Sequence, residues 1–147
     1  MFRIETGVDK QRRALLGKKL RAANVDRSPA IRGLVETGTE DEVPLQVWAF
    51  DAEGQLAGGL AGRVWARWLH VDLLWIDERH RAAGLGTRLL DEAEERARAD
   101  HGCVSSRLET WDFQAPGFYR KRGYEVIGEV PDYPPGVTEY ILVKALV

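Results

Sequence analysis

The chain has 147 residues, of which 44% are hydrophobic and 30% are charged. A chain of this length and composition is expected to fold as one globular domain, residues 1–147, and not to stay disordered. Its 21 basic and 23 acidic residues leave a net charge of −2. Because a general nucleic-acid binder shows a marked basic excess, we expect no nucleic-acid partner.

The scarcity of cysteines, paired histidines and apolar runs excludes further classes of protein. Cys103 is the only cysteine, so neither an intrachain disulfide nor a cysteine-rich metal site can form. The three histidines lack the H-x-x-x-H spacing of a metal site, and we expect no metal. No apolar run of about 18 residues and no signal-peptide core is present, so we expect a cytoplasmic protein without a membrane partner.

The N-terminal third is expected to contain a short strand, one helix and a loop. Residues around Ile4 are expected to form a short strand. Asp9 is suited to cap a helix over about residues 10–22, in which Leu16 and Leu20 share one face. Residues 24–44 mix prolines, glycines and acidic residues, which predicts a loop with room for one helical turn.

The rest of the chain predicts a regular alternation of strands and helices. From Gly84, apolar residues recur every four positions, which predicts an amphipathic helix that ends near His101. The other expected elements are antiparallel strands at 45–50, 56–65 and 68–76, a strand at 104–110, a helix at 116–121 and a strand pair at 124–130 and 137–143. The fold class is therefore α+β, with a mixed, mostly antiparallel sheet of six or seven strands.

The segment between the third strand and the long helix, RHRAAGLGTRLL, predicts an anion site. A helix that starts after a glycine-containing turn presents free backbone N–H groups, and its dipole favours negative charge. Gly84 and Gly86 let phosphate oxygens approach the main chain, and Arg79 and Arg81 flank the turn. These features suit a phosphorylated cofactor, although a plain tight turn with solvated arginines also fits the same residues.

The pattern of this loop separates the candidate cofactors. A Walker loop, G-x-x-x-x-G-K-[ST], is absent, and Leu89 stands where a Rossmann fingerprint needs its third glycine. The hexapeptide Arg81–Gly86, RAAGLG, has the form [QR]-x-x-G-x-[GA]. It resembles the signature of the GNAT superfamily of acyl-CoA-dependent N-acyltransferases.

A second motif downstream supports the same resemblance. Many GNAT members carry N-x-x-A-x-x-x-Y-x-x-x-G-[FY] there, and DFQAPGFYRKRGY matches it at Ala115, Tyr119, Gly123 and Tyr124. The chain departs from the pattern at Asp112, where the family has an asparagine. An ionised carboxylate cannot donate a hydrogen bond as an asparagine does, so the contact made by that residue would be lost. Gln114 is a candidate to replace that contact.

The resemblance implies a fold and an activity. The fold would be a three-layer α/β/α sandwich with helices on both faces of the sheet. The activity would be transfer of an acetyl group from acetyl-CoA to a primary amine of a small molecule or peptide. A catalytically silent module that binds acyl-CoA is the alternative, and a homodimer is common in the family.

The resemblance also implies which residues form the site. Tyr119 would protonate the departing thiolate. The alternation of the strand 68–76 would place His70, Asp72, Leu74 and Ile76 on one face, so that His70 serves as base and Asp72 orients it or binds a cationic substrate. Both residues also fit a purely structural, hydrogen-bonded role, and Tyr119 also fits a helix tyrosine that packs on the sheet. The residues expected to bind the cofactor are Leu74, Trp75, Ile76, Arg79, Arg81, Ala82, Ala83, Gly84, Gly86, Thr87, Asp112 and Gln114.

Overall fold

The structure is a computed structural model that describes residues 1–147, and the chain divides into two compact units, residues 1–40 and 41–147. The first unit contains two helices, and the second contains the sheet with the remaining helices. The single domain over residues 1–147 stays a prediction.

The first unit is more helical than its sequence pattern predicts. Helix α1 spans Lys10–Arg27, and the Asp9 side chain accepts a hydrogen bond from the backbone N–H of Arg12 at 2.9 Å, which confirms the predicted cap. The strand expected near Ile4 is absent. The loop with one helical turn expected over 24–44 underestimates the helix, because α1 continues to Arg27 and helix α2 spans Pro29–Glu36. Ser28 caps α2 and a proline occupies its first position, a start signal that outweighs the loop-like composition.

The second unit confirms the predicted α+β class. Its sheet has six strands in the order β1-β2-β3-β4-β6-β5, and every neighbouring pair is antiparallel except β3 and β4, which are parallel. The elements are β1 (Val43–Phe50), β2 (Leu56–Trp65), β3 (Trp68–Ile76), the 3₁₀ helix η1 (Glu78–Ala83), α3 (Leu85–His101), β4 (Ser105–Trp111), α4 (Pro116–Lys121), β5 (Glu125–Val130) and β6 (Glu139–Ala145).

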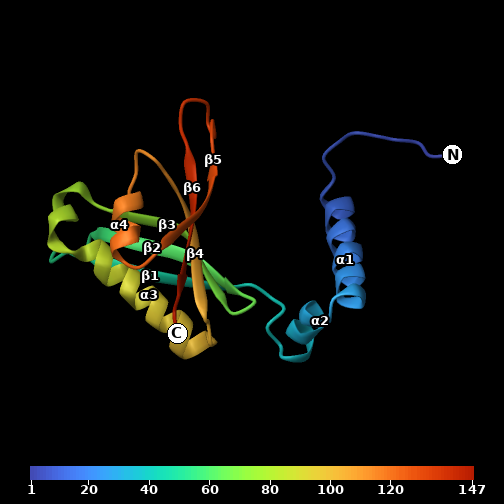
Figure 1. Cartoon of the computed structure of the whole chain (residues 1–147), viewed down its shortest axis with the longest axis horizontal. Coiled ribbons are helices and arrows are strands. Elements are labelled where there is room, and N and C mark those ends of the chain that lie inside the picture. Colours follow the sequence, from blue (N-terminus) through green and yellow to red (C-terminus); the bar gives the residue numbers. More distant parts are fainter. The chain divides into compact units, whose positions relative to one another are not determined.

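The core of this unit lies between helix α3 and one face of the sheet. The apolar stripe of α3 includes Leu90, Ala93 and Ala97, which are fully buried against Leu60 and Leu69 of the sheet. Helix α3 contacts β1, β2 and β3, and Figure 1 shows it running across this part of the sheet. Burial of this kind stabilises a fold by about 25 cal/mol per Å² of apolar surface, so the stripe fixes α3 on this face. The covering of both faces by helices stays a prediction.

A buried polar network ties α3 to the end of the chain. Glu94 on α3 accepts hydrogen bonds from Lys144 of β6 at 2.6 Å and from the Tyr124 hydroxyl at 2.8 Å. The Ser106 hydroxyl lies 2.8 Å from the same Tyr124 oxygen. Because a buried carboxylate is stable only with such partners, the network fixes where α3 lies along the sheet.

Strands β3 and β4 part midway along their length. They pair from Trp68–Ser105 to Val71–Leu108, after which each continues without the other, β3 to Ile76 and β4 to Trp111. The edges that face each other there have no ladder partner. The sheet is therefore split at the end where β3 leads into the glycine loop.

A bulge in β3 accompanies this split and corrects one prediction. In the β2–β3 pair, Val71 lies opposite Gly62 and Leu73 lies opposite Ala61, so Asp72 is an extra residue. The extra residue reverses the alternation of faces beyond it. The prediction that His70, Asp72 and Leu74 share one face is therefore wrong.

Candidate active site

The glycine loop has the conformation that the sequence predicted. Helix η1 ends at Ala83. Gly84 follows with a φ of 73°, in the left-handed region, and α3 begins at the next residue without a side-chain cap. The first N–H groups of an uncapped helix have no intrahelical partner. They are available to an anion, and the exposed Arg81 beside them adds a positive charge.

A pocket of about 720 Å³, the loop pocket, joins this loop to the split in the sheet. Its predicted members are Leu74, Trp75, Ile76, Arg81, Gly84, Gly86, Thr87, Gln114 and Tyr119. Phe113, Ala115 and Phe118 line it as well and were not predicted as contacts, although Ala115 belongs to the second motif. Two motifs that lie far apart in the sequence thus line one cavity.

Some predicted cofactor residues lie elsewhere. The Arg79 guanidinium donates to the Asp77 carboxylate at 3.0 Å, and this hydrogen bond lowers the pKa of Asp77 to about 2. Asp112 accepts from the backbone N–H of Thr138 at 3.1 Å and does not line the loop pocket. The pocket's lining also excludes Ala82 and Ala83.

Gln114, and not Asp112, brings a side-chain amide to the loop pocket. Its side-chain oxygen accepts from the backbone N–H of Trp111 at 3.0 Å and from the Thr110 hydroxyl at 3.2 Å. Both bonds engage the oxygen alone, so the amide NH₂ group keeps its two donors. Gln114 lines the loop pocket and can donate into it.

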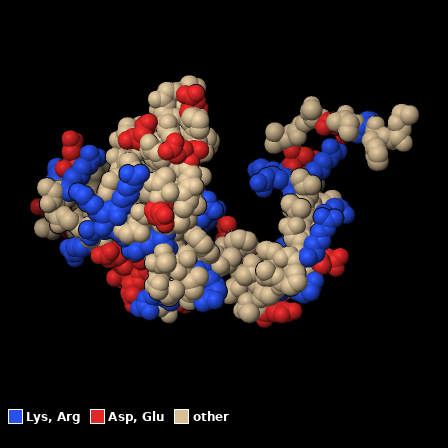
Figure 2. Space-filling model, in the orientation of Figure 1, with Lys and Arg blue, Asp and Glu red and all other residues tan.

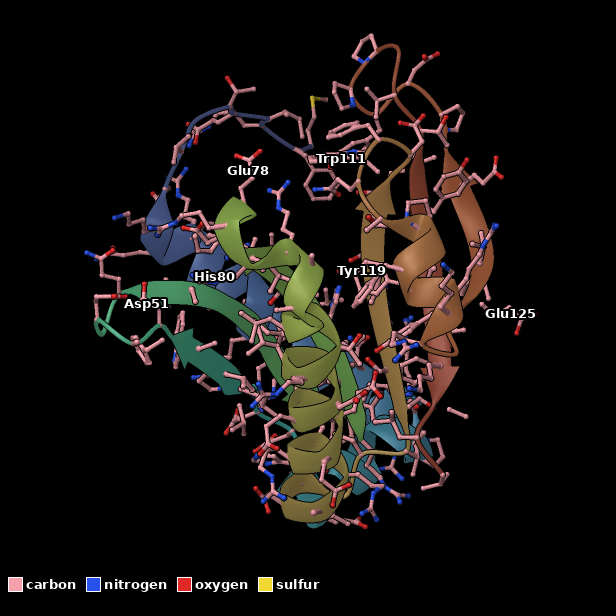
Figure 3. All side chains as sticks on the ribbon, turned by 90° about the vertical axis from the view of Figure 1, so that its left-hand side faces the viewer. Asp51, Glu78, His80, Trp111, Tyr119 and Glu125 are labelled. Atoms are coloured by element: carbon pink, nitrogen blue, oxygen red, sulfur yellow. The ribbon has the colours of Figure 1, made fainter.

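Tyr119 lines the loop pocket from helix α4. Its ring packs edge-on against Phe118 and Tyr124, and Figure 3 shows it between α3 and β4. Its exposed fraction is 8%, and burial raises the pKa of its phenol above the ordinary value. No protein group hydrogen-bonds the Tyr119 hydroxyl. Because every buried side-chain oxygen in the structure has a partner, this hydroxyl must be accessible from outside the core. Tyr119 lines the loop pocket, so its hydroxyl opens into that pocket.

A second pocket of about 430 Å³, the carboxylate pocket, adjoins the first. The two pockets share Gln114. The carboxylate pocket is lined by Asp72, Leu73, Glu109, Trp111, Gln114, Tyr133 and Glu139. Of the residues that line it, Asp72 alone belongs to the predicted catalytic set.

His70 lies behind Glu109 and outside the carboxylate pocket. Its Nδ1 is 2.9 Å from an Arg63 nitrogen, and its Nε2 is 2.7 Å from a Glu109 oxygen. Since Arg63 can only donate, Nδ1 accepts and Nε2–H donates to Glu109. Both ring nitrogens are therefore engaged, and His70 instead lines a separate hollow with Arg63 and Arg107.

Glu109 is a charged residue of the carboxylate pocket that the sequence did not reveal. Burial alone would raise the pKa of its carboxyl group, but the hydrogen bond from His70, followed by the hydrogen bond and charge of Arg107, brings that pKa below the ordinary value. Arg107 donates to its second oxygen at 3.1 Å. Glu109 is therefore an ionised carboxylate held in a fixed orientation at the pocket wall.

The structure shows neither a metal centre nor a transmembrane helix. No group of three or more His, Cys, Asp or Glu side chains is arranged to hold a metal ion. None of the helices is both long and apolar enough to span a bilayer.

Comparisons with known proteins agree with the geometry. The sequence profile of the acetyltransferase (GNAT) family matches residues 19–124. A blasticidin-S acetyltransferase of Streptomyces morookaense is 53% identical over 131 residues, which cover 87% of this chain and 96% of that protein.

Solved structures share the fold. A crystal structure of an acetyltransferase from Bacillus cereus is 30% identical, with a TM-score of 0.84 over 98% of this chain and 97% of that one. A Bacillus anthracis protein solved in complex with acetyl coenzyme A has a TM-score of 0.62 at 19% identity, over 69% of this chain and 62% of that one. The fold, the uncapped helix after the glycine turn and the family profile lead to one conclusion: this chain belongs to the GNAT family and is an acetyltransferase that uses acetyl-CoA.

Proposed function

We propose that the chain transfers the acetyl group of acetyl-CoA to a primary amine of a small molecule. The observation that carries this proposal is the Tyr119 hydroxyl, which opens into the loop pocket where β3 and β4 part. The likeness to an enzyme named for blasticidin S supports a small-molecule acceptor.

Acetyl-CoA would bind along the loop pocket. The diphosphate would lie against the N–H groups at the start of α3, close to Gly84, Gly86 and Arg81. The pantetheine amides would pair with the free edge of β3 at residues 74–76, and Gln114 would donate to the same arm. This placement brings the thioester to the split in the sheet, next to Tyr119.

The reaction would be a direct transfer. The amine nitrogen attacks the thioester carbonyl carbon, and a backbone N–H at the free edge of β3 stabilises the oxyanion. Donors of this kind contribute roughly 3–4 kcal/mol to transition-state stabilisation. The C–S bond then breaks with its electron pair on sulfur, and Tyr119 donates a proton to that thiolate.

The attacking amine must also lose a proton, and a base other than Tyr119 has to take it. We assign this step to Glu109, because its carboxylate lines the carboxylate pocket while both nitrogens of His70 are engaged. His70 is then a positioning residue that orients Glu109. Asp72 lines the same pocket, where its charge would attract the acceptor amine.

An acceptor screen tests this proposal. Purified protein is mixed with acetyl-CoA and a panel of primary amines that includes blasticidin S, and release of free thiol is followed. We expect thiol release that depends on the amine, with a product heavier by one acetyl group in a mass spectrum. Thiol release without any acetylated amine, or no release with the whole panel, would overturn the proposal.

A further inference from the structure

The carboxylate pocket carries more negative charge than amine activation needs. Its lining contains the carboxylates of Asp72, Glu109 and Glu139 and no lysine, arginine or histidine. Asp72 lies 3.6 Å from Arg63, and Glu109 binds His70 and Arg107 on its far side. Glu139 is half-buried and forms no ion pair or side-chain hydrogen bond. One carboxylate of this pocket is therefore without a counter-charge.

Aromatic rings stand beside the unpaired carboxylate. Trp111 is the ladder partner of Glu139, and Tyr133 lines the same pocket. The indole N–H donates to the Tyr133 carbonyl at 2.7 Å, and the indole ring stacks on Phe113 at 5.7 Å. Both contacts fix the orientation of the indole. Rings held next to a carboxylate are favourable surroundings for an organic cation.

The pocket has an inner end and an outer end. Glu109 and Asp72 lie on β4 and β3 just beyond the last paired residues, where the acetyl group would arrive. Trp111 lies two residues further along β4, which corresponds to about 7 Å, and Figure 3 shows it beyond Tyr119. In Figure 2 acidic side chains are visible over the β5–β6 hairpin and basic ones over α4. The charges of the acceptor and cofactor sides therefore differ in sign.

The chemistry of the transfer limits what these carboxylates can hold. The reacting amine must be neutral when it attacks, and any carboxylate held against it in addition to Glu109 and Asp72 would further favour its charged form. A second cation on the acceptor avoids this conflict, because it gains the attraction without protonating the nucleophile.

We propose that the acceptor carries a second cationic group, an ammonium or a guanidinium, and that Glu139, Trp111 and Tyr133 bind this group at the outer end of the carboxylate pocket. The inference rests on the proposed function for the reacting end of the acceptor. It adds a subsite that selects dications with a spacer of several atoms between the two nitrogens.

Matched acceptors test the subsite. Agmatine carries a primary amine and a guanidinium, and hexylamine has a similar length with an apolar end. We expect kcat/KM for thiol release to be about tenfold or more higher with agmatine, as expected for a hydrogen-bonded charge pair. In Glu139→Gln the agmatine-to-hexylamine ratio should fall about tenfold, and in Tyr133→Leu it should fall severalfold. Glu129→Gln on β5, which removes one charge outside the pocket, should leave the ratio unchanged.

Direct binding separates this inference from the proposed function. Calorimetry of agmatine and hexylamine with the wild-type protein, Glu139→Gln and Tyr133→Leu, each saturated with CoA, measures the subsite without turnover. Agmatine that binds tighter in a Glu139-dependent way supports the subsite even if no amine is acetylated. Equal binding of the two amines, or an agmatine preference that survives Glu139→Gln and Tyr133→Leu, would overturn the subsite even if both amines are acetylated.

Discussion

The loop pocket and the carboxylate pocket meet at Gln114, yet they are built in different ways. The loop pocket comes mainly from two short sequence motifs and offers backbone N–H groups, one arginine and apolar side chains. The carboxylate pocket comes from single residues on β3, β4, β6 and the loop before β6, and its charged residues are all acidic. Under the proposed function, the contrast means that local backbone geometry binds the cofactor, whereas side chains from distant parts of the sequence bind the acceptor amine.

The largest expected effect comes from the group between the two pockets. Tyr119→Phe removes the hydroxyl and keeps the ring contacts, so kcat should fall about 10²–10⁴-fold, the usual range for a general acid. Affinity for CoA, measured by calorimetry, should stay within about twofold because binding does not need a proton transfer. A variant with near wild-type kcat would contradict the role of Tyr119.

Variants of Glu109 and His70 test which of the two residues is the base and which only positions it. Glu109→Gln keeps an oxygen that can accept from His70 and removes the negative charge, and we expect kcat/KM for the amine to fall roughly 10²-fold. His70→Gln should reduce it only about tenfold, because the carboxylate of Glu109 remains. If His70→Gln proves the more damaging change, then His70 is the base and our assignment is wrong.

Gly84 tests whether the backbone of the loop holds the cofactor. Its φ of 73° strains any residue with a Cβ atom, so Gly84→Val should displace the start of α3 and raise KM for acetyl-CoA about tenfold. Gly54→Val is the matched control, because Gly54 has a φ of 78° in the turn between β1 and β2 and lines neither pocket. Equal KM values in the two variants would show that only general strain is at work.

Arg81 gives a smaller and salt-dependent effect. It is exposed, and its Nε donates to the Ile76 carbonyl at 3.3 Å, so Arg81→Gln should raise KM for acetyl-CoA severalfold at low salt. The increase should shrink at high ionic strength, because about 0.15 M salt already screens exposed charges beyond about 8 Å. KM for the amine should not change; a change of similar size would mean that the pockets do not work separately.

The pH dependence should be the mildest effect. Glu109 accepts a proton only when ionised, and because its pKa is lowered, it is ionised at every pH above its ordinary value of about 4.3. Tyr119 donates only when protonated, and because its pKa is raised, it stays protonated up to at least the ordinary tyrosine value of about 10. The profile of kcat/KM should therefore rise with deprotonation of the acceptor amine and then stay level. A fall that begins near about pH 8 would contradict Tyr119 as the acid.

The elements and site residues that the sequence predicted correctly depend on interactions between neighbouring residues. Apolar periodicity predicted α3, and two motifs pointed to Gly84, Gly86 and Tyr119, which all line the loop pocket. Helix α2 was missed because the prolines and glycines around it are typical of a loop, although Ser28 and Pro29 together form a start signal.

The site features that the sequence predicted wrongly or did not reveal depend on residues far apart in the chain. Strand alternation put His70, Asp72 and Leu74 on one face, whereas the bulge at Asp72 depends on the pairing of β3 with β2. Glu109 gained its place only because β4 pairs with β3 and then leaves it, and Glu139 because β6 lies beside β4.

The sequence alone determined the class of fold, the family and the glycine turn before α3, because periodicity, glycine conformation and helix starts are set by neighbouring residues. The tertiary structure decided which carboxylates meet, how both nitrogens of His70 are engaged and where the second pocket lies. Those features depend on strand order and on where two strands separate, and residues far apart in the chain set them through packing rather than through local preference.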